Sequence, residues 1–249
     1  MNLPEKLIFV RHYKAHKAGS KPVAKYKETR LSDSQFPLRQ EGIAQAKVVR
    51  SWLDVVFPEI DGYLCPEYVR SSQSAGLTFP DISWSVDPNL DERSHGTGFV
   101  SFFRQALKSS IFLYHTRSVE SMVDVVDRWQ KVKARLAAEY ADSKCVLAFS
   151  HGEYIAGVQC DLERISRAWY DQHYKELILP HGGILVYSRY SHGDSGDLQP
   201  EYVKKRVVDL FGRKDTGWLD ISGVTPGPAT AVAGSTLVDR AWQFSIFEE

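Results

Sequence analysis

Two short apolar runs, each followed closely by a histidine, constrain the fold of this chain more than any other feature. Leu7–Val10 lies just before His12, and Cys145–Phe149 lies just before His151. Apolar runs this short are typical of strands that are buried on both faces, as in a parallel sheet. We therefore expect two buried strands, each of which presents a histidine near its C-terminal end.

Other segments have the spacing of helices and strands. Apolar residues recur every three or four positions from Arg39 to Phe57 and from Val119 to Tyr140, and a shorter helix is expected from Val69 to Leu77. Further strands are expected at Gly62–Cys65, at Gly183–Tyr190 and at Glu201–Leu210, the last with Lys204, Lys205 and Arg206 on an edge of the sheet.

Strands that alternate with helices indicate an α/β protein. The expected arrangement has three layers, α/β/α, with a mainly parallel central sheet and helices on both faces. In such sheets, ligands bind beyond the C-terminal ends of the strands, where the strand order reverses. Because His12 and His151 both follow strand ends, we predict that they meet at one site although about 140 residues separate them.

The composition excludes several classes of protein. Of the 249 residues, 43% are hydrophobic and 25% are charged, which fits a globular protein and argues against a disordered or fibrous chain. Lys plus Arg and Asp plus Glu each number 31, so no overall positive charge favours nucleic acid as a partner. No stretch approaches the roughly 20 apolar residues of a membrane helix, so we expect no membrane partner.

The cysteines indicate a reducing environment. Cys65, Cys145 and Cys160 are odd in number, and two of them lie in apolar runs, which argues against a disulfide framework. The apolar run near the N-terminus is also too short for the core of a signal peptide. We therefore expect a cytoplasmic protein.

Histidine and arginine together suit phosphoryl chemistry. A neutral imidazole nitrogen can carry a covalent intermediate, and guanidinium groups bind phosphate oxygens in a bidentate manner. Arg11 is adjacent to His12, and Arg70 lies at an expected helix start, where backbone N–H groups also favour an anion. The two guanidinium groups would lower the pKa of His12, whereas a bound phosphate would raise it. The net direction is open at this point.

Six motifs, in order, resemble those of the histidine phosphatase superfamily, which has a phosphoglycerate mutase-like fold. The order makes the resemblance specific, because Arg-His or Ser-His-Gly alone is a weak signal. The motifs extend over roughly residues 7–190 and are Val10-Arg11-His12, Pro37-Leu38 with Glu41-Gly42 and Gln45-Ala46, Arg70 to Ala75, Leu90 to Gly96, Glu120-Ser121 with Asp124 and Arg128, and Phe149 to Gly152.

The resemblance implies a role for each matching residue. His12 would accept the phosphoryl group, Arg11 and Arg70 would clamp it, and His151 would donate a hydrogen bond to it. Glu92 matches the usual general acid of the family, which protonates the leaving oxygen and then deprotonates the attacking water. No metal or other cofactor is required in this scheme.

The sequence also departs from the usual family pattern. His181 lies where the family often has a backbone contact to phosphate, and it is a further candidate for phosphate binding. Tyr13 replaces the usual Gly, so either the loop runs differently or the tyrosine forms a wall of the pocket. Arg39 stands where Thr usually caps the long helix, which leaves Asp33 or Ser34 as substitutes for the cap.

One domain is expected over residues 1–212, with a cap inserted around 93–118 and an irregular tail over 213–249. The aromatic residues of the cap either line a substrate pocket or pack in the core. The stretch Lys14–Arg30 contains six basic residues and one acidic residue. It either overhangs the site, where it would attract substrates with several negative charges, or forms a solvated loop.

These observations favour a metal-independent phosphomonoesterase that acts through a phosphohistidine on a small phosphorylated metabolite and releases inorganic phosphate. One alternative is a mutase that returns the phosphoryl group to a phosphoglycerate. It ranks lower because the residues after His12 lack the serine-rich and asparagine-containing run of mutases. The other alternative is a non-catalytic member of the same fold that binds a phosphorylated ligand or a protein. A homodimer is a possible assembly.

Overall fold

A mixed sheet forms the centre of the molecule in the computed structural model, which describes residues 3–16, 32–96 and 110–222. The strand order is β3 (Ser85–Val86), β2 (Gly62–Cys65), β4 (Cys145–Ser150), β1 (Lys6–Arg11), β5 (Ile184–Ser188), β6 (Lys204–Asp209) and β7 (Lys214–Asp215), and β8 (Leu219–Asp220) also pairs with β6. Strands β1 to β4 pair in parallel, whereas β5 to β8 join the sheet antiparallel. The parallel core agrees with the expected fold class.

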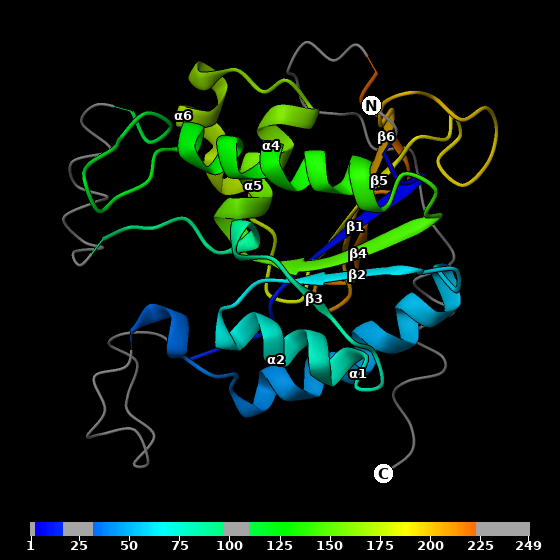
Figure 1. Cartoon of the computed structure of the whole chain (residues 1–249), viewed down its shortest axis with the longest axis horizontal. Helices are drawn as coiled ribbons and strands as arrows, with labels where there is room; N and C mark the ends of the chain where they lie inside the picture. The colour runs from blue at the N-terminus through cyan, green and yellow to red at the C-terminus, as the bar shows by residue number, and fades with distance from the viewer. Residues whose placement is uncertain (1–2, 17–31, 97–109, 223–249) are drawn as a thin grey trace.

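Helices cover both faces of this sheet. In Figure 1, α1 (Gln40–Val56) and α2 (Val69–Thr78) lie below it, and α4 (Met122–Glu139), α5 (Gly152–Leu162) and α6 (Arg167–Leu177) lie above it. Two short 3-10 helices, η2 (Asp33–Gln35) and η3 (Pro88–Leu90), precede α1 and α4 in the chain. The expected three-layer α/β/α arrangement is thus confirmed.

The alternation of side chains along each central strand produces two separate cores. Leu7 and Phe9 of β1 pack in the core beneath α4, α5 and α6, whereas Ile8 and Val10 pack in the core against α1 and α2. All four side chains are fully buried. This explains why β1 has no polar residue between its ends, since both of its faces are covered.

The start of α1 packs closely against the segment that follows the first histidine. Arg39 occupies the N-cap position without a side-chain hydrogen bond, as the loss of the usual Thr predicts. Its backbone N–H donates instead to the carbonyl of Lys14, at 2.9 Å. Neither Asp33 nor Ser34 replaces the cap, because both lie within η2, which ends before α1 begins.

Two expectations about the C-terminal part of the sheet were wrong. Strand β6 is not an edge, because β5 pairs with one of its sides while β7 and β8 pair with the other. Arg206 is therefore buried, with its guanidinium group bound to the carboxylate of Asp215 from β7. The same strands extend the sheet past residue 212, where we expected an irregular tail to begin. Residues 223–249 of that tail lie outside the described part of the chain.

None of the described helices is both long enough and apolar enough to cross a membrane.

Candidate active site

Strand pairing brings the two histidines together. Arg11 and Ser150 are register partners of the parallel strands β1 and β4, so the next residue of each chain segment is a histidine at the same edge of the sheet. The ring centroids of His12 and His151 lie 5.0 Å apart, and both residues are buried. The backbone N–H of His12 also donates to the carbonyl of Ser150. The structure therefore agrees with the predicted convergence of these residues.

The hydrogen bonds of His12 define which of its nitrogens is available for reaction. Its Nδ1 lies 2.7 Å from the carbonyl oxygen of Tyr13, which can only accept, so Nδ1 carries the proton. Its Nε2 accepts a hydrogen bond of 3.2 Å from Nε of Arg70. Burial lowers the pKa of His12 well below its ordinary value, and the nearby Arg70, His181 and Arg11 lower it further. In this structure His12 is thus a neutral imidazole with a lone pair on Nε2.

Arg70, near the start of α2, is held against both His12 and η2. One Nη donates to the backbone carbonyl of Asp33 at 2.6 Å, and the other lies 2.9 Å from the carboxylate of the same residue. The guanidinium group also lies over the ring of Tyr68, 4.8 Å from its centroid. Arg70 therefore presents its Nε to the histidine while Asp33 holds its outer nitrogens.

Arg11, at the end of β1, lies beside the first residue of α5. One Nη donates to the carbonyl of Leu179, and its buried Nε has no hydrogen-bond partner among the described residues. A Cβ at Gly152 would lie only 3.1 Å from Cζ of Arg11. The glycine of the Ser-His-Gly motif therefore leaves room for this guanidinium group next to the helix start.

The carboxyl group of Glu92 is anchored at the N-terminus of α5. Its Oε1 accepts hydrogen bonds from the backbone N–H groups of Arg93, Glu153 and Tyr154, at 3.1 to 3.3 Å. Its Oε2 lies 4.0 Å from Nδ1 of His151. Burial raises the pKa of Glu92, and the neighbouring Glu153 raises it further. The environment therefore favours the protonated form of this carboxyl group.

Glu153 is a second, largely buried carboxylate with partners of its own. Its Oε2 lies 3.0 Å from Nε2 of His95 and 3.4 Å from the guanidinium group of Arg93. Burial raises the pKa of Glu153, but His95 and Arg93 outweigh burial and lower it overall. The two carboxyl groups thus have pKa values shifted in opposite directions, a pattern typical of acid–base sites.

His151 has one paired and one unpaired ring nitrogen. Its Nε2 lies 3.0 Å from the hydroxyl of Ser71, and its Nδ1 is buried with no partner in the described part of the chain. Burial lowers the pKa of His151 well below its ordinary value, and His12 and Arg70 add to this effect. His151 is therefore neutral, and one of its nitrogens is aimed toward Glu92.

A third imidazole lies on the other side of His12. The ring centroid of His181 is 5.0 Å from that of His12, and its Nδ1 is 3.3 Å from the backbone oxygen of His12. Burial lowers the pKa of His181 to about 4, and Arg11 contributes to this shift. His181 thus lies beside the two arginines and the nucleophile candidate, at the position that the motif order indicates.

Tyr13 packs behind the site and does not form a wall of it. The side chain is fully buried, its ring lies edge-on to Phe149, and its hydroxyl is 2.6 Å from Oγ1 of Thr78. Its backbone N–H donates to the hydroxyl of Ser74. The tyrosine therefore replaces the usual glycine by pointing into the core, and its backbone carbonyl remains available to His12.

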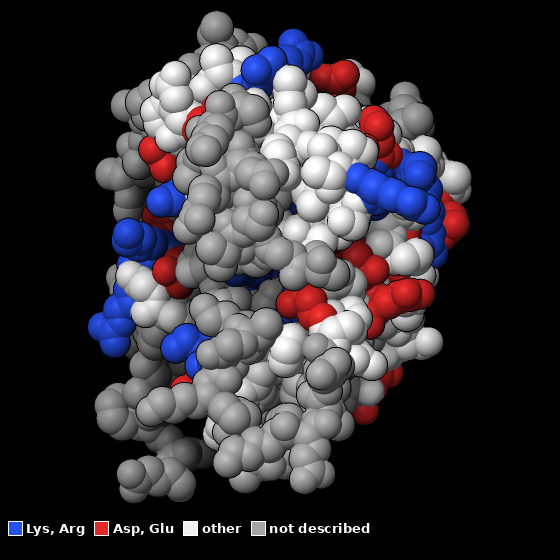
Figure 2. Space-filling model, turned by 90° about the vertical axis from the view of Figure 1, so that its left-hand side faces the viewer, with Lys and Arg blue, Asp and Glu red and all other residues white. Residues whose placement is uncertain are grey.

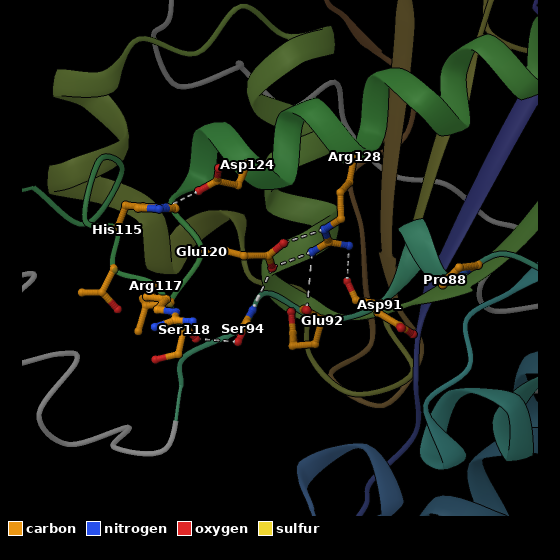
Figure 3. Close-up of a pocket in the computed structure, with 12 residues that line it drawn as sticks. Pro88, Asp91, Glu92, Ser94, His115, Arg117, Ser118, Glu120, Asp124 and Arg128 are labelled. Atoms are coloured by element: carbon orange, nitrogen blue, oxygen red, sulfur yellow. Dashed lines mark hydrogen bonds and ion pairs between the residues drawn. The ribbon is translucent and has the colours of Figure 1, made fainter.

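A polar recess of about 410 Å³ adjoins Glu92 (Figure 3). Arg128 of α4 reaches into it and binds both carboxylate oxygens of Glu120, at 2.9 and 3.0 Å. The same guanidinium group donates to the backbone carbonyls of the segment that carries Glu92. The recess thus lies between residues 89–92, which Arg128 holds in place, and residues 115–120.

The surface on one side of the molecule carries charges of both signs. Figure 2, which views the side of the molecule where α2 begins, shows Lys and Arg interspersed with Asp and Glu, with no large patch of either sign among the described residues. Most of the basic stretch Lys14–Arg30 lies outside the described residues, as do the cap residues 97–109. The described residues also contain no cluster of three or more histidine, cysteine or acidic side chains arranged to hold a metal ion.

Three residues of this arrangement were missed by the sequence analysis. Asp33 binds Arg70, and Ser71 contacts His151. The backbone N–H of Glu153 donates to the carboxylate of Glu92. Ser71 and Glu153 directly follow Arg70 and the Ser-His-Gly motif, so adjacency to a motif was the available signal. Asp33 had no such signal, because it contacts Arg70 from a separate segment.

Comparison with known proteins identifies the family. The model described as histidine phosphatase superfamily (branch 1) matches residues 7–177, which is more than half of the chain. This chain belongs to the histidine phosphatase superfamily. No curated protein matches it.

Solved structures of the superfamily have the same fold. A phosphoserine phosphatase mutant from Entamoeba histolytica, in complex with phosphoserine, has a TM-score of 0.57 at 15% identity, over 75% of this chain and 91% of that chain. A putative alpha-ribazole-5'-P phosphatase from Escherichia coli has a TM-score of 0.57 at 18% identity, over 76% and 92%. A mycobacterial glucosyl-3-phosphoglycerate phosphatase has a TM-score of 0.55 at 18% identity, over 74% and 92%.

Proposed function

We propose that this protein is a phosphomonoesterase that hydrolyses small phosphorylated metabolites through a phosphohistidine, without a metal ion. The observation that carries this proposal is the state of His12. Its Nδ1 proton is committed to the carbonyl of Tyr13 and its Nε2 lone pair faces Arg70. A buried, neutral imidazole next to fixed cations is an activated nucleophile for an anionic phosphoryl group.

In the first step, Nε2 of His12 attacks phosphorus and the bond from phosphorus to the leaving oxygen breaks. Arg11, Arg70 and His181 surround the position of the phosphoryl oxygens, and His151 donates a hydrogen bond to one of them. Arg70 gives up its hydrogen bond to Nε2 when the phosphoryl group enters, and the charge of that group is then stabilised by cations that the fold already holds beside His12. The product of this step is a phosphohistidine and a free alcohol.

Glu92 supplies the proton for the leaving oxygen. Its raised pKa favours the protonated carboxyl group that this role requires, and its anchored Oε1 leaves Oε2 directed toward His151. In the second step, the resulting carboxylate removes a proton from water, the water oxygen attacks phosphorus, and the bond to Nε2 breaks. Inorganic phosphate leaves and Glu92 is again protonated.

The polar recess beside Glu92 accommodates the leaving group. Its lining is almost entirely polar or charged, with Pro88 and Val119 as exceptions. The charged and hydroxyl-bearing side chains of this lining can hydrogen-bond a hydroxylated or charged leaving group. The related phosphatases that share the fold, among them the phosphoserine phosphatase, support a small polar ester as the substrate.

The decisive experiment measures phosphate release from p-nitrophenyl phosphate and from a panel of phosphorylated metabolites, with EDTA present. His12→Ala should lower kcat by about 10³-fold or more, since it removes the covalent nucleophile. His192→Ala, at an exposed histidine in the β5–β6 connection, is the matched control and should retain full activity.

Each alternative reaction has a distinct outcome in the same assay. Phosphoryl transfer between phosphoglycerates without phosphate release would identify a mutase. Binding of phosphate esters without turnover would identify a non-catalytic member. Activity that EDTA abolishes and added metal restores would refute the metal-independent mechanism.

A further inference from the structure

Ser71 occupies an unusual position beside the second histidine of the site. It lies in the first turn of α2, directly after Arg70, and it is fully buried, as is His151. The distance from its Oγ to Nε2 of His151 is 3.0 Å. The hydroxyl makes no other hydrogen bond with the described residues, so His151 is the only acceptor that these residues offer to its proton.

The contact has two possible directions, and they differ in which ring nitrogen of His151 carries the proton. If Nε2 donates to the hydroxyl, the proton of Ser71 is buried without an acceptor and Nδ1 is an unprotonated nitrogen. If Ser71 donates to Nε2, its hydroxyl proton is satisfied and Nδ1 carries the ring proton. The first direction leaves both the hydroxyl proton and the Nδ1 lone pair unpaired, whereas the second leaves only the Nδ1 proton, on the side of Glu92, so the second direction is favoured.

The position of Nδ1 gives this choice a consequence for the site. Nδ1 is buried, has no partner among the described residues, and lies 4.0 Å from Oε2 of Glu92. The ring of His151 is also 5.0 Å from that of His12. A proton on Nδ1 would face the space between the nucleophile and the general acid, whereas a lone pair there would repel an anion.

We propose that Ser71 is a positioning residue that holds His151 in the tautomer with its proton on Nδ1. This inference rests on the proposed function, because it assigns Nδ1 as the atom that donates to the transferring phosphoryl group. Ser71 itself does not touch the substrate. Its effect is transmitted through the imidazole, whose depressed pKa leaves it with a single ring proton to place.

The direct test is to locate that proton by NMR. In protein labelled with ¹⁵N-histidine, long-range ¹H–¹⁵N spectra distinguish a protonated ring nitrogen from an unprotonated one. The His151 signal is identified as the one missing from His151→Gln. We expect the protonated nitrogen of His151 to be Nδ1 in the wild-type protein. Protonation of Nε2 would overturn the inference, whether or not the protein is a phosphatase.

Two variants connect the tautomer to activity. Ser71→Ala should give a mixture of tautomers and lower kcat about tenfold with little change in KM, as expected for loss of one hydrogen bond that acts in the transition state. Ser72→Ala is the matched control, because Ser72 is exposed on the same turn and its hydroxyl contacts only the backbone of Val69. It should leave both the spectrum and kcat unchanged.

The outcomes separate this inference from the proposed function. If Ser71→Ala retains both the wild-type kcat and the Nδ1 tautomer, the inference is wrong although the phosphatase reaction stands. If His12→Ala remains fully active, the proposed function fails, and the spectrum of the wild-type protein still decides the tautomer. A Ser71→Ala protein that does not fold leaves the wild-type spectrum as the deciding measurement.

Discussion

Gly42 is the point at which α1 meets the segment that follows His12. A Cβ at this position would lie 2.1 Å from the carbonyl oxygen of Lys14 and 3.1 Å from its nitrogen. Both atoms belong to the backbone and are held in place, since the oxygen accepts from Arg39 N–H and the nitrogen donates to Gln45 Oε1. We therefore predict that Gly42→Ala destabilises the protein and disturbs the site.

The size of this effect follows from comparison with a second helical glycine. A Cβ at Gly76, in α2, has no atom within 4 Å. Replacing glycine by alanine in a helix stabilises it by about 0.5–1 kcal/mol, so Gly76→Ala should be more stable than the wild type. For Gly42→Ala the backbone must move by about 1 Å, and overpacking of this kind costs about 1–3 kcal/mol. Both variants gain the same helix propensity from alanine. Their free energies of unfolding should therefore differ by about the overpacking cost alone.

Urea unfolding followed by tryptophan fluorescence measures this difference, because Trp52 and Trp129 are fully buried in the two cores. Steady-state kinetics provide the second measurement. Lys14 is two residues from His12, so Gly42→Ala should also lower kcat/KM, whereas Gly76→Ala should not. Equal stabilities of the two variants, or a Gly42→Ala protein with unchanged kcat/KM, would refute the close approach described here.

Two further predictions concern buried charges. Because the pKa of His181 falls from 6.5 when unfolded to about 4 when folded, the unfolded state binds the proton first, and stability is lost as the pH falls through that interval. His181→Asn should therefore reduce the loss of unfolding free energy between pH 7 and pH 5 by about 2 kcal/mol, and an unchanged pH profile would contradict this. Arg206→Met should cost about 3–5 kcal/mol in urea unfolding because it leaves the buried carboxylate of Asp215 without its cation, whereas Lys144→Met, which breaks the exposed pair with Glu59, should cost far less. Similar losses in the two variants would show that β6 is a solvated edge.

The local pattern of the sequence predicted most of the sheet and its helices. The apolar run of β1 alone predicts a strand that is buried on both faces. The periodicity of α1 and α4 predicts one buried face for each helix. Motif order then located His12, Arg70, Glu92 and His151 at the edge of the sheet. These features are readable because each depends on a residue and its near neighbours in sequence.

The features that the sequence did not predict depend on distant segments. The basic residues of β6 resemble an exposed edge, and only the pairing of Arg206 with Asp215 from β7 makes burial of that guanidinium group tolerable. Likewise, the contact between Ser71 and His151 joins positions 80 residues apart. Neither residue type indicates its partner in advance, since serine and aspartate are ordinary surface residues.

The pairing of β1 with β4 also determines when the site can form during synthesis. An emerging chain that ends before residue 145 already contains Arg11, His12 and Arg70, but β1 then lacks both of its neighbours, β4 and β5. Contacts over such distances in sequence form late and slowly. A nascent chain on the ribosome therefore contains His12 long before the site can form, and the two histidines can meet only after β4 has been translated.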